Sequence, residues 1–427
     1  MIGSKFRPLI SRLSLAVALI AAPHVAFAAD AVGMSLGDKP AVKTPYATEA
    51  LLLGVARAGS RIVAVGEYGD IVLSDDDGKT WRQAKSVPTQ VTLTAVCFVD
   101  DKTGWAVGHD TVVLHTTDAG ETWTKQFGGG ASDNALLTVA FWDADHGIAM
   151  GAFNFTAETK DGGKTWVQRK TLNPIQVKPA APGAAAPPGG AAPAGAPAAA
   201  PVPAAAPPKP ARAGAGAGDD GDGADSKDPY AAATGDENHL NAAFLTPDGS
   251  MFVAAEAGAV FRSFDKGATW EKVLTGYNGS FWGGFAAKDG TLYITGMHGN
   301  IWHSTDKGKT WTKLDTQGAD QSVAQGLQLK GGDFVFVGLG GQVLYSPDGQ
   351  KFTLTYRPDR KGLNAVLEDG ADHLLVFGET GIKDQSRTPP PGQVVVQSAP
   401  PPPAPAPATT PAPATTPAPA TTPAPKG

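Results

Sequence analysis

The chain of 427 residues contains a single cysteine, Cys97. A disulfide within the chain needs two cysteines and a cysteine-based metal centre needs more, so the sequence excludes both. Cys97 lies in the β-branched run VTLTAVCFV. Such a run predicts a buried strand, so we expect Cys97 to act as a small buried hydrophobic residue and not as a reactive thiol.

Charge is also scarce. Only 18% of the residues are charged, the formal net charge is −6 and the isoelectric point is near 5.8. A nucleic-acid-binding protein needs a basic face that displaces counterions, so no nucleic-acid partner is predicted. After the N-terminal leader, no continuous apolar run approaches the 18 residues of a membrane-spanning helix, so we expect no direct membrane insertion once the leader is removed.

The N-terminus predicts export. Residues 1–28 combine a basic start, an apolar run over 13–22 and small residues at Ala26 and Ala28. This is the pattern of a secretory signal peptide that is cleaved after Ala28. We therefore expect the mature protein in the periplasm.

Glycine and proline are abundant, with 53 and 36 copies, but they gather in two tracts. Residues 179–219 are almost wholly Ala, Pro and Gly, and residues 399–427 repeat PAPATT. Neither composition can bury a core, so both tracts are expected to be extended or disordered. We assign 175–236 as an insertion and 391–427 as a tail.

The rest of the chain is a repeat. The stretch SDDDGKTW at 74–81 recurs as TTDAGETW, TKDGGKTW, SFDKGATW and STDKGKTW, with a degenerate SPDGQKF at 346–352. The terminal aromatics recur every 41 to 43 residues, except across the insertion. Each repeat holds about four short runs rich in Val, Ile and Leu, which is the pattern of one blade of a β-propeller.

The predicted fold is an all-β, seven-bladed β-propeller. Blades 1–3 occupy 50–174 and blades 4–7 occupy 237–390, and the seventh is the incomplete copy LLVFGETGIKDQSR. We expect a strand from the N-terminal segment, 29–49, to complete blade seven and close the ring. QVVVQ at 393–397 is the competing candidate.

The recurring stretch has the skeleton Ser/Thr-x-Asp-x-Gly-x-Thr-Trp. We expect its Asp to accept backbone N–H groups, its Gly to adopt positive φ, and its Trp to pack between blades, in turns joining the third and fourth strands. A phosphate loop is excluded because the preceding glycine is missing at the required spacing. Asp75 and Asp77 are interpreted as solvated turn residues. The structural set is Asp76, Gly78, Trp81, Asp118, Gly120, Trp123, Asp161, Gly163, Trp166, Asp265, Gly267, Trp270, Asp306, Gly308 and Trp311.

This skeleton resembles the Asp-box of bacterial neuraminidase-type (BNR-repeat) propellers. Residues 51–123, from LLLGVARAG to DAGETW, are similar to the photosystem II stability/assembly factor family, and the similarity extends over about 45–387. The resemblance implies an exported seven-bladed propeller that holds a subunit during assembly of a membrane complex. In non-photosynthetic bacteria the resemblance implies an accessory protein that accompanies an RND-type exporter.

The resemblance also implies a basic patch on one propeller face. We find no arginine-rich cluster across neighbouring blades, which favours a general docking role over a photosynthetic one. The expected partner is a membrane-embedded envelope protein bound by a monomeric propeller, without a cofactor.

A sialidase-like or other carbohydrate-active propeller is the alternative. Hydrolysis by sialidases needs an arginine cluster for the substrate carboxylate, a Tyr nucleophile with a Glu partner, and an acid/base Asp. The Phe-Arg-Ile-Pro signature of sialidases is absent, and the nearest resemblance is Arg61-Ile62-Val63. We therefore predict no catalytic residues.

The candidate partner-binding face is formed by loops between the second and third strands of each repeat, which we expect to converge near the axis. These loops differ between repeats while the Asp turns do not, and variable loops on a repeated frame provide specificity. Their His and acidic residues come from different blades, so no metal site is predicted. The candidates are Glu67, Tyr68, His109, Asp110, Phe153, Asn154, Glu256, His298, Asn300 and Glu379, with Met297 and Gly340-Gly341 beside them.

Overall fold

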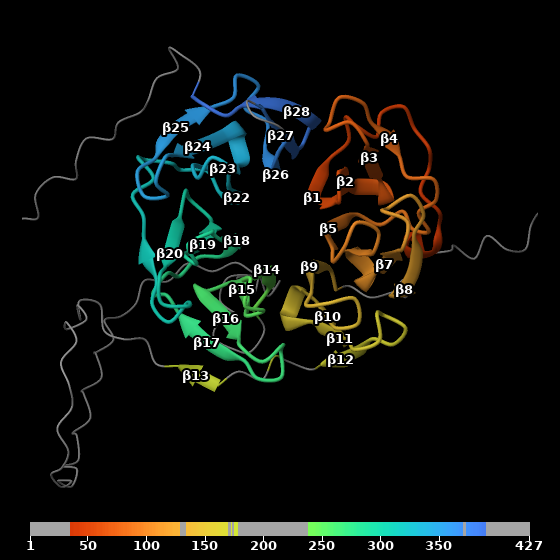
Figure 1. The fold of residues 1–427 in the computed structure, drawn as a ribbon, viewed down its shortest axis with the longest axis horizontal. Helices are drawn as coiled ribbons and strands as arrows, with labels where there is room; N and C mark the ends of the chain where they lie inside the picture. The colour runs from red at the N-terminus through yellow and green to blue at the C-terminus, as the bar shows by residue number, and fades with distance from the viewer. Residues whose placement is uncertain are drawn as a thin grey trace, which may run out of the picture.

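The computed structural model describes residues 35–128, 134–169, 172, 175–177, 238–369 and 373–389. Seven antiparallel sheets stand around a central axis, as Figure 1 shows. The predicted seven-bladed β-propeller is therefore confirmed. In the described part of the chain no helix is long and apolar enough to cross a membrane.

The first three blades are four-stranded sheets in which each strand pairs with the next along the chain. Blade 1 consists of β1 (Leu52–Ala58), β2 (Arg61–Gly66), β3 (Ile71–Ser74) and β4 (Arg82–Gln83). Blade 2 consists of β5 (Leu93–Phe98), β6 (Gly104–Gly108), β7 (Val113–Thr116) and β8 (Thr124–Phe127). Blade 3 consists of β9 (Leu136–Phe141), β10 (Gly147–Gly151), β11 (Thr156–Thr159) and β12 (Val167–Arg169).

Blade 4 has a fifth strand and blade 7 has only three described strands. Blade 4 is β14 (Leu240–Leu245), β15 (Met251–Ala255), β16 (Ala259–Ser263) and β17 (Glu271–Leu274), with β13 (Ile175–Val177) parallel to β17. Blade 5 is β18 (Phe281–Ala286), β19 (Leu292–Gly296), β20 (Ile301–Ser304) and β21 (Thr312–Lys313). Blade 6 is β22 (Val323–Gln328), β23 (Phe334–Gly338), β24 (Gln342–Ser346) and β25 (Thr353–Tyr356). Blade 7 is β26 (Leu363–Glu368), β27 (His373–Gly378) and β28 (Gly381–Ser386).

Burial follows strand position within a blade. The middle strands are buried on both faces, as in β6 and β15, because each blade is packed between two others. The fourth strands are less buried, and both residues of β21 are exposed. Val- and Ile-rich runs without alternation therefore occupy the middle strands, where β-branched side chains pack well against neighbouring sheets.

The first strands form the inner ring. β1, β5, β9, β14, β18, β22 and β26 each contact the next, and β26 returns to β1. Across that junction, Asn364 Nδ2 donates to Leu52 O at 3.2 Å and Arg57 Nη2 donates to Glu368 O at 3.0 Å. The ring is thus closed directly by blade 7 against blade 1.

The predicted closing strand is wrong for the described part of the N-terminal segment. Residues 35–51 form only the short 3₁₀ helix η1 (Leu36–Asp38) and turns, without a strand. The segment follows the outer edge of blade 1, where Ala41 N donates to Val87 O and Thr44 N to Gln83 Oε1. It reaches blade 7 at Thr48, whose carbonyl accepts from Ile382 N at 3.1 Å, and at Ala47, which packs in one cluster with Leu375 and Phe377. Residues 29–34 and the competing 393–397 lie outside the described residues.

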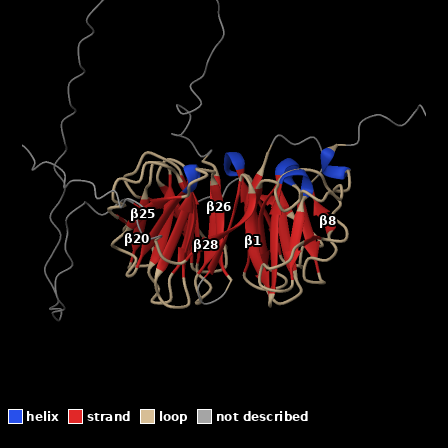
Figure 2. Ribbon diagram, turned by 90° about the horizontal axis from the view of Figure 1, so that it is seen from above, coloured by secondary structure: helices blue, strands red, loops and turns tan. Residues whose placement is uncertain are grey.

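The two ends of the blades differ in structure. Short 3₁₀ turns between second and third strands lie on one face of the ring, the upper face in Figure 2. They are η2 (Glu67–Gly69), η3 (His109–Thr111), η4 (Ala152–Asn154) and η5 (Leu339–Gly341). Antiparallel strands then place the turns between third and fourth strands on the opposite face. We call the face that carries the turns between second and third strands the 2–3 face, and the face that carries the turns between third and fourth strands the 3–4 face.

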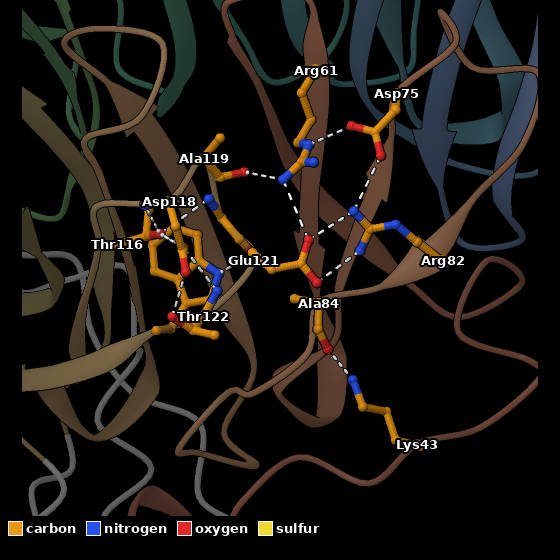
Figure 3. Close-up of polar contacts among 12 residues, drawn as sticks. Lys43, Arg61, Asp75, Arg82, Ala84, Thr116, Asp118, Ala119, Glu121 and Thr122 are labelled. Carbon is orange, nitrogen blue, oxygen red and sulfur yellow. Dashed lines mark hydrogen bonds and ion pairs between the residues drawn. The ribbon is translucent and has the colours of Figure 1, made fainter.

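An ion-pair network joins blades 1 and 2 at the rim, as Figure 3 shows. Asp75 lies 2.5 Å from Arg61 and 3.1 Å from Arg82. Glu121, from blade 2, accepts from Arg82 at 3.0 and 2.7 Å and lies 3.5 Å from Arg61. Arg61 also donates to Ala119 O at 3.2 Å, so side chains of blade 1 hold the turn of blade 2.

This network corrects the expectation that Asp75 and Asp77 are simply solvated. Asp75 pairs with two arginines, and Asp77 pairs with Arg57 at 3.1 Å. Half of each carboxylate side chain remains exposed, so each pair contributes at most about 1 kcal/mol.

The glycine of each Ser/Thr-x-Asp-x-Gly-x-Thr-Trp turn should affect stability in two ways. It has positive φ, and it contacts the preceding blade. Gly308 has φ +71°, and a Cβ there would lie 2.9 Å from the buried ring of Phe252 in blade 4. Gly249 has φ +82° with open space around it. We expect Gly249→Ala to cost about 1 kcal/mol of unfolding free energy and Gly308→Ala about 2–4 kcal/mol, because overpacking is added to strain.

Urea unfolding of the two variants separates these contributions, since both carry the same substitution at similar φ. Equal losses of stability would show that the packing between blades at Gly308 contributes nothing.

Candidate functional site

The recurring stretch forms a closed hydrogen-bonded turn, which we call the Asp turn. In blade 2, Asp118 Oδ1 accepts from Thr116 Oγ1 at 2.8 Å and from Thr122 N at 2.9 Å, and Asp118 Oδ2 accepts from Thr122 Oγ1 at 2.6 Å. Gly120 N donates to Thr116 Oγ1, and Trp123 Nε1 donates to Gly120 O at 2.8 Å. Figure 3 shows this turn beside the ion-pair network. The carboxylate is occupied by its own turn.

The same bonds recur in blades 1, 3, 4 and 5, around Asp76, Asp161, Asp265 and Asp306. Their glycines have positive φ, from +71° at Gly308 to +85° at Gly163. A Cβ at each of these glycines would approach a side chain of the preceding blade. The indole N–H of the Trp bonds the turn glycine in four blades, with Trp166 as the exception. In these five blades each Asp carboxylate therefore bonds groups of its own turn, and each turn glycine lies against the preceding blade.

The Asp turns lower the pKa of their carboxyl groups. At Asp76, hydrogen bonds from the Thr80 hydroxyl and then the Thr80 backbone N–H hold the pKa at about 2, below its ordinary 3.8. At Asp161 the pKa is lowered for the same reason by Thr165. These bonds favour the ionised form, because a carboxylate accepts them more strongly than a carboxylic acid.

This shift predicts the acid sensitivity of the fold. Because the folded pKa of Asp76 is lowered, its stabilising contribution is complete above about 3.8 and is lost as pH falls toward about 2. Asp76→Asn should therefore be less stable than the parent protein near neutral pH, and the difference should shrink between about pH 4 and 2. Urea unfolding across this range measures it.

Asp145→Asn is the matched control, since Asp145 is exposed and belongs to no Asp turn. A stability difference for Asp76→Asn that stays constant down to about pH 2 would contradict this account.

The 2–3 face is built on a repeated left-handed turn. Two consecutive residues have positive φ at the same place in successive blades, such as Tyr68-Gly69, Asp110-Thr111, Phe153-Asn154 and His298-Gly299. The backbone N–H of the preceding residue donates to the residue before the first strand, as Glu67 N does to Leu51 O at 3.0 Å. The frame of this face is therefore constant, and its side chains vary.

Four of the predicted candidates are hydrogen-bonded to this backbone or buried beneath it. Glu67 Oε1 accepts from Leu51 N at 3.0 Å, and Glu256 Oε2 accepts from His239 N at 3.0 Å. Asn300 is buried and donates to Met297 O at 2.7 Å. Asn154 is also buried. These four side chains therefore stabilise the turns themselves.

Five of the other six candidates are exposed, and Asp110 is half-buried. Tyr68 is 68% exposed and Phe153 is 58% exposed, and His109, His298 and Glu379 are exposed as well. They come from blades 1, 2, 3, 5 and 7, so the structure places them on one face without gathering them at a point. The turns η2, η3, η4 and η5 contact first strands of the inner ring, so the turns that carry Tyr68, His109 and Phe153 lie next to that ring.

Tyr68 and Phe153 differ from ordinary surface residues. Both are bulky side chains in left-handed backbone, with φ of 56° and 53°, a position that glycine adopts without strain. Blade 6 has Gly340 at the corresponding position. Exposed aromatic residues in strained backbone are more typical of a recognition surface than of a scaffold.

The sequence analysis missed the contribution of the N-terminal segment. Val42 and Tyr46 are 64% and 67% exposed, and a Cβ at Gly69 would lie 3.3 Å from Ala41. The segment therefore runs directly beside the turn that carries Tyr68. Its apolar residues predict a closing strand, and nothing in the local sequence indicates that Val42 and Tyr46 face solvent.

A polar cleft of about 300 Å³ lies between blades 5 and 6 on the 3–4 face. Tyr293, His303, Asp289 and Asp348 line it. Burial, followed by the charges of Asp289 and Asp348, raises the pKa of Tyr293 to about 12. The phenol is therefore held protonated at neutral pH, and no arginine lines the cleft.

Among the described residues, no three His, Cys, Asp or Glu side chains are grouped as metal ligation requires. Cys97 is half-buried and packs against the core cluster of blades 2 and 3, where desolvation raises the pKa of its thiol to about 12. At neutral pH it is a thiol and not a thiolate.

Comparison with known families supports the predicted resemblance. Residues 48–127 match the family model described as photosynthesis system II assembly factor YCF48. This match spans blades 1 and 2. No curated protein matches the chain. The similarity to a photosystem II assembly-factor-like family is thus confirmed for this part of the sequence.

Solved structures show the same fold at low identity. YCF48 bound to a D1 peptide is 17% identical with a TM-score of 0.54, over 82% of this chain and 100% of that chain. YCF48 from Cyanidioschyzon merolae is 14% identical with a TM-score of 0.51, over 80% and 96%. Virginiamycin B lyase from Staphylococcus aureus is 10% identical with a TM-score of 0.56, over 81% and 96%. Because an assembly factor and a lyase share this architecture, the fold alone does not decide the function.

Proposed function

We propose that this protein is a non-catalytic assembly or docking factor that binds a segment of a membrane-protein partner on its 2–3 face. The observation that carries this proposal is the pair of exposed aromatic side chains, Tyr68 and Phe153, held in left-handed backbone at equivalent positions of blades 1 and 3. Aromatic residues provide most of the binding energy in many protein interfaces. The match of residues 48–127 to an assembly-factor family supports this role.

The chemistry of this face favours an apolar and neutral partner segment. Val42 and Tyr46 extend the exposed apolar surface along the edge of blade 1. The arginines of blade 1 are not available for an acidic partner there. Arg61 and Arg82 are paired with Asp75 and Glu121 at the rim, where two positive and two negative charges cancel.

An enzymatic function is supported less well. A sialidase-type mechanism needs a tyrosine that a base can ionise and arginines that hold a substrate carboxylate. In the cleft between blades 5 and 6, Tyr293 has a raised pKa and no arginine is present among the lining residues. We therefore infer a binding function.

The compartment and the partner belong to the same proposal. The signal-peptide pattern of residues 1–28, which lie outside the described residues, supports a periplasmic location. A propeller in that compartment would meet the exposed loops of an envelope membrane protein, and an RND-type exporter is one such partner.

Site-specific photo-crosslinking tests the proposed face. A crosslinking amino acid in place of Tyr68 or Phe153 should capture a membrane protein from detergent-solubilised membranes of the source bacterium. The same probe in place of Phe264, an exposed aromatic residue in the Asp turn of blade 4, should not. Capture from all three positions, or from none, would contradict the proposal.

Tyr68→Gly separates binding from folding. Glycine relieves the left-handed strain, so the unfolding free energy should fall by no more than about 0.5 kcal/mol. Affinity for the captured partner should fall at least about tenfold if Tyr68 is an anchor. Unfolding in urea and a binding titration measure the two quantities. Stability lost together with unchanged affinity would assign Tyr68 to the scaffold.

Hydrolysis of a fluorogenic sialoside, abolished by Tyr293→Phe and retained in Tyr68→Gly, would instead favour a carbohydrate-active propeller.

A further inference from the structure

Among the described residues, blade 7 ends on a strand whose outer edge is only partly paired. Its sheet has the order β26-β27-β28, whereas the other six sheets have a fourth strand outside the third. Thr48 covers one end of β28 by accepting from Ile382 N. Since N–H groups point to the same edge at alternate residues of a strand, the N–H groups of Asp384 and Ser386 face the open edge. An open strand edge is a site for pairing with another strand.

A groove lies beside this edge. It has a volume of about 470 Å³. Its lining residues are Ile382, Lys383 and Asp384 of β28, Leu375 of β27, Gly78 and Trp81 of blade 1, and Thr48 and Glu49 of the N-terminal segment. The ring of Trp81 meets Phe377 edge to face, with centroids 6.0 Å apart. The groove is therefore the junction between the last blade and the first Asp turn.

At five other junctions an apolar side chain fills the corresponding position. In each of these five blades, a residue in the fourth strand or within three residues after it enters the cluster that holds the turn aromatic of the next blade. The pairs are Ala84 with Trp123, Phe127 with Trp166, Leu172 with Trp270, Val273 with Trp311, and Leu314 with Phe352. In the cluster around Trp81, only Ala47 of the N-terminal segment is comparable.

We propose that residues 393–397, QVVVQ, of the same chain form the fourth strand of blade 7 and fill this groove. In five blades the fourth strand starts eight residues after the last residue of the third, as in Ser74 to Arg82, and in blade 6 it starts after seven. From Ser386, the same spacing reaches Gln393 or Val394. The intervening sequence RTPPPG ends the third strand with Pro and Gly, which favour a turn.

The available length of edge matches such a strand. β4 and β21 are only two residues long, so two pairs suffice for a fourth strand in this ring. The carbonyls of Asp384 and Ser386 already accept bonds from Arg357 at 3.0 Å and Tyr345 at 2.9 Å of blade 6. The incoming strand would thus meet chiefly the N–H groups of β28. Thr48 and QVVVQ would then share the outer edge of blade 7, so segments from both ends of the chain would cover it.

Two truncations of the full chain test this. A protein ending at Gln397 keeps the strand and lacks the PAPATT tail, and a protein ending at Pro389 lacks both. We expect the first to unfold at the temperature of the full chain and the second to unfold several degrees lower, because a protected edge and an apolar contact are lost. Equal melting temperatures for the two truncations would overturn the proposal.

Substitutions within QVVVQ test the same pairing in the full-length chain. Alternate side chains of a strand face opposite sides, so either Val395→Asp or the double variant Val394→Asp/Val396→Asp should destabilise the protein strongly, and the other should not. If neither variant lowers the melting temperature, or both lower it equally, QVVVQ does not pair in the groove.

Hydrogen exchange distinguishes QVVVQ of the same chain from a second copy of the protein at the edge of β28. The Asp384 amide should exchange at least about tenfold faster in the Pro389 truncation than in the Gln397 truncation. Unchanged exchange, or protection that depends on protein concentration, would assign the edge to a second copy and overturn the pairing within one chain.

Discussion

The packing of each Asp turn against the preceding blade is the contact on which the ring depends. The turn glycine has positive φ and approaches a side chain of the blade before it, as Gly308 approaches Phe252. The Asp carboxylate holds that conformation by accepting the Thr hydroxyl and backbone N–H of its own turn. A side chain at the glycine position would separate neighbouring blades. The same local geometry therefore fixes both the turn and the spacing of the sheets.

This arrangement leaves the opposite face free to vary. On the 2–3 face the hydrogen bonds between turn and first strand belong to the backbone, so the side chains at the left-handed position can be Tyr, Asp, Phe, His or Gly without loss of the frame. Tyr68 and Phe153 are strained there and exposed, which is costly without a binding role. A conserved frame with variable exposed positions suits a docking protein, and the proposed partner face follows from it.

Much of the fold could be predicted from the sequence because the repeated residues act locally. Asp76, Gly78 and Trp81 interact within a few residues of one another, so their recurrence marks each blade directly. The site was predicted less well. Glu67, Glu256 and Asn300 have the composition of binding residues, yet they bond backbone groups of their own blade. The pairing of Arg61 and Arg82 with Glu121 was missed because the residues come from separate strands and two blades.

The sequence by itself determined the number of blades, the position of the insertion and the chemistry of the Asp turns, since all three depend on short-range periodicity. Only the tertiary structure decided which varied residues reach solvent, how blade 1 binds blade 2, and how the ring closes. The N-terminal segment illustrates the difference: its apolar residues suggested a strand, but Ala47 and Thr48 contact blade 7 while Val42 and Tyr46 face solvent. Which edge a segment covers depends on contacts between residues hundreds of positions apart, and no local pattern encodes them.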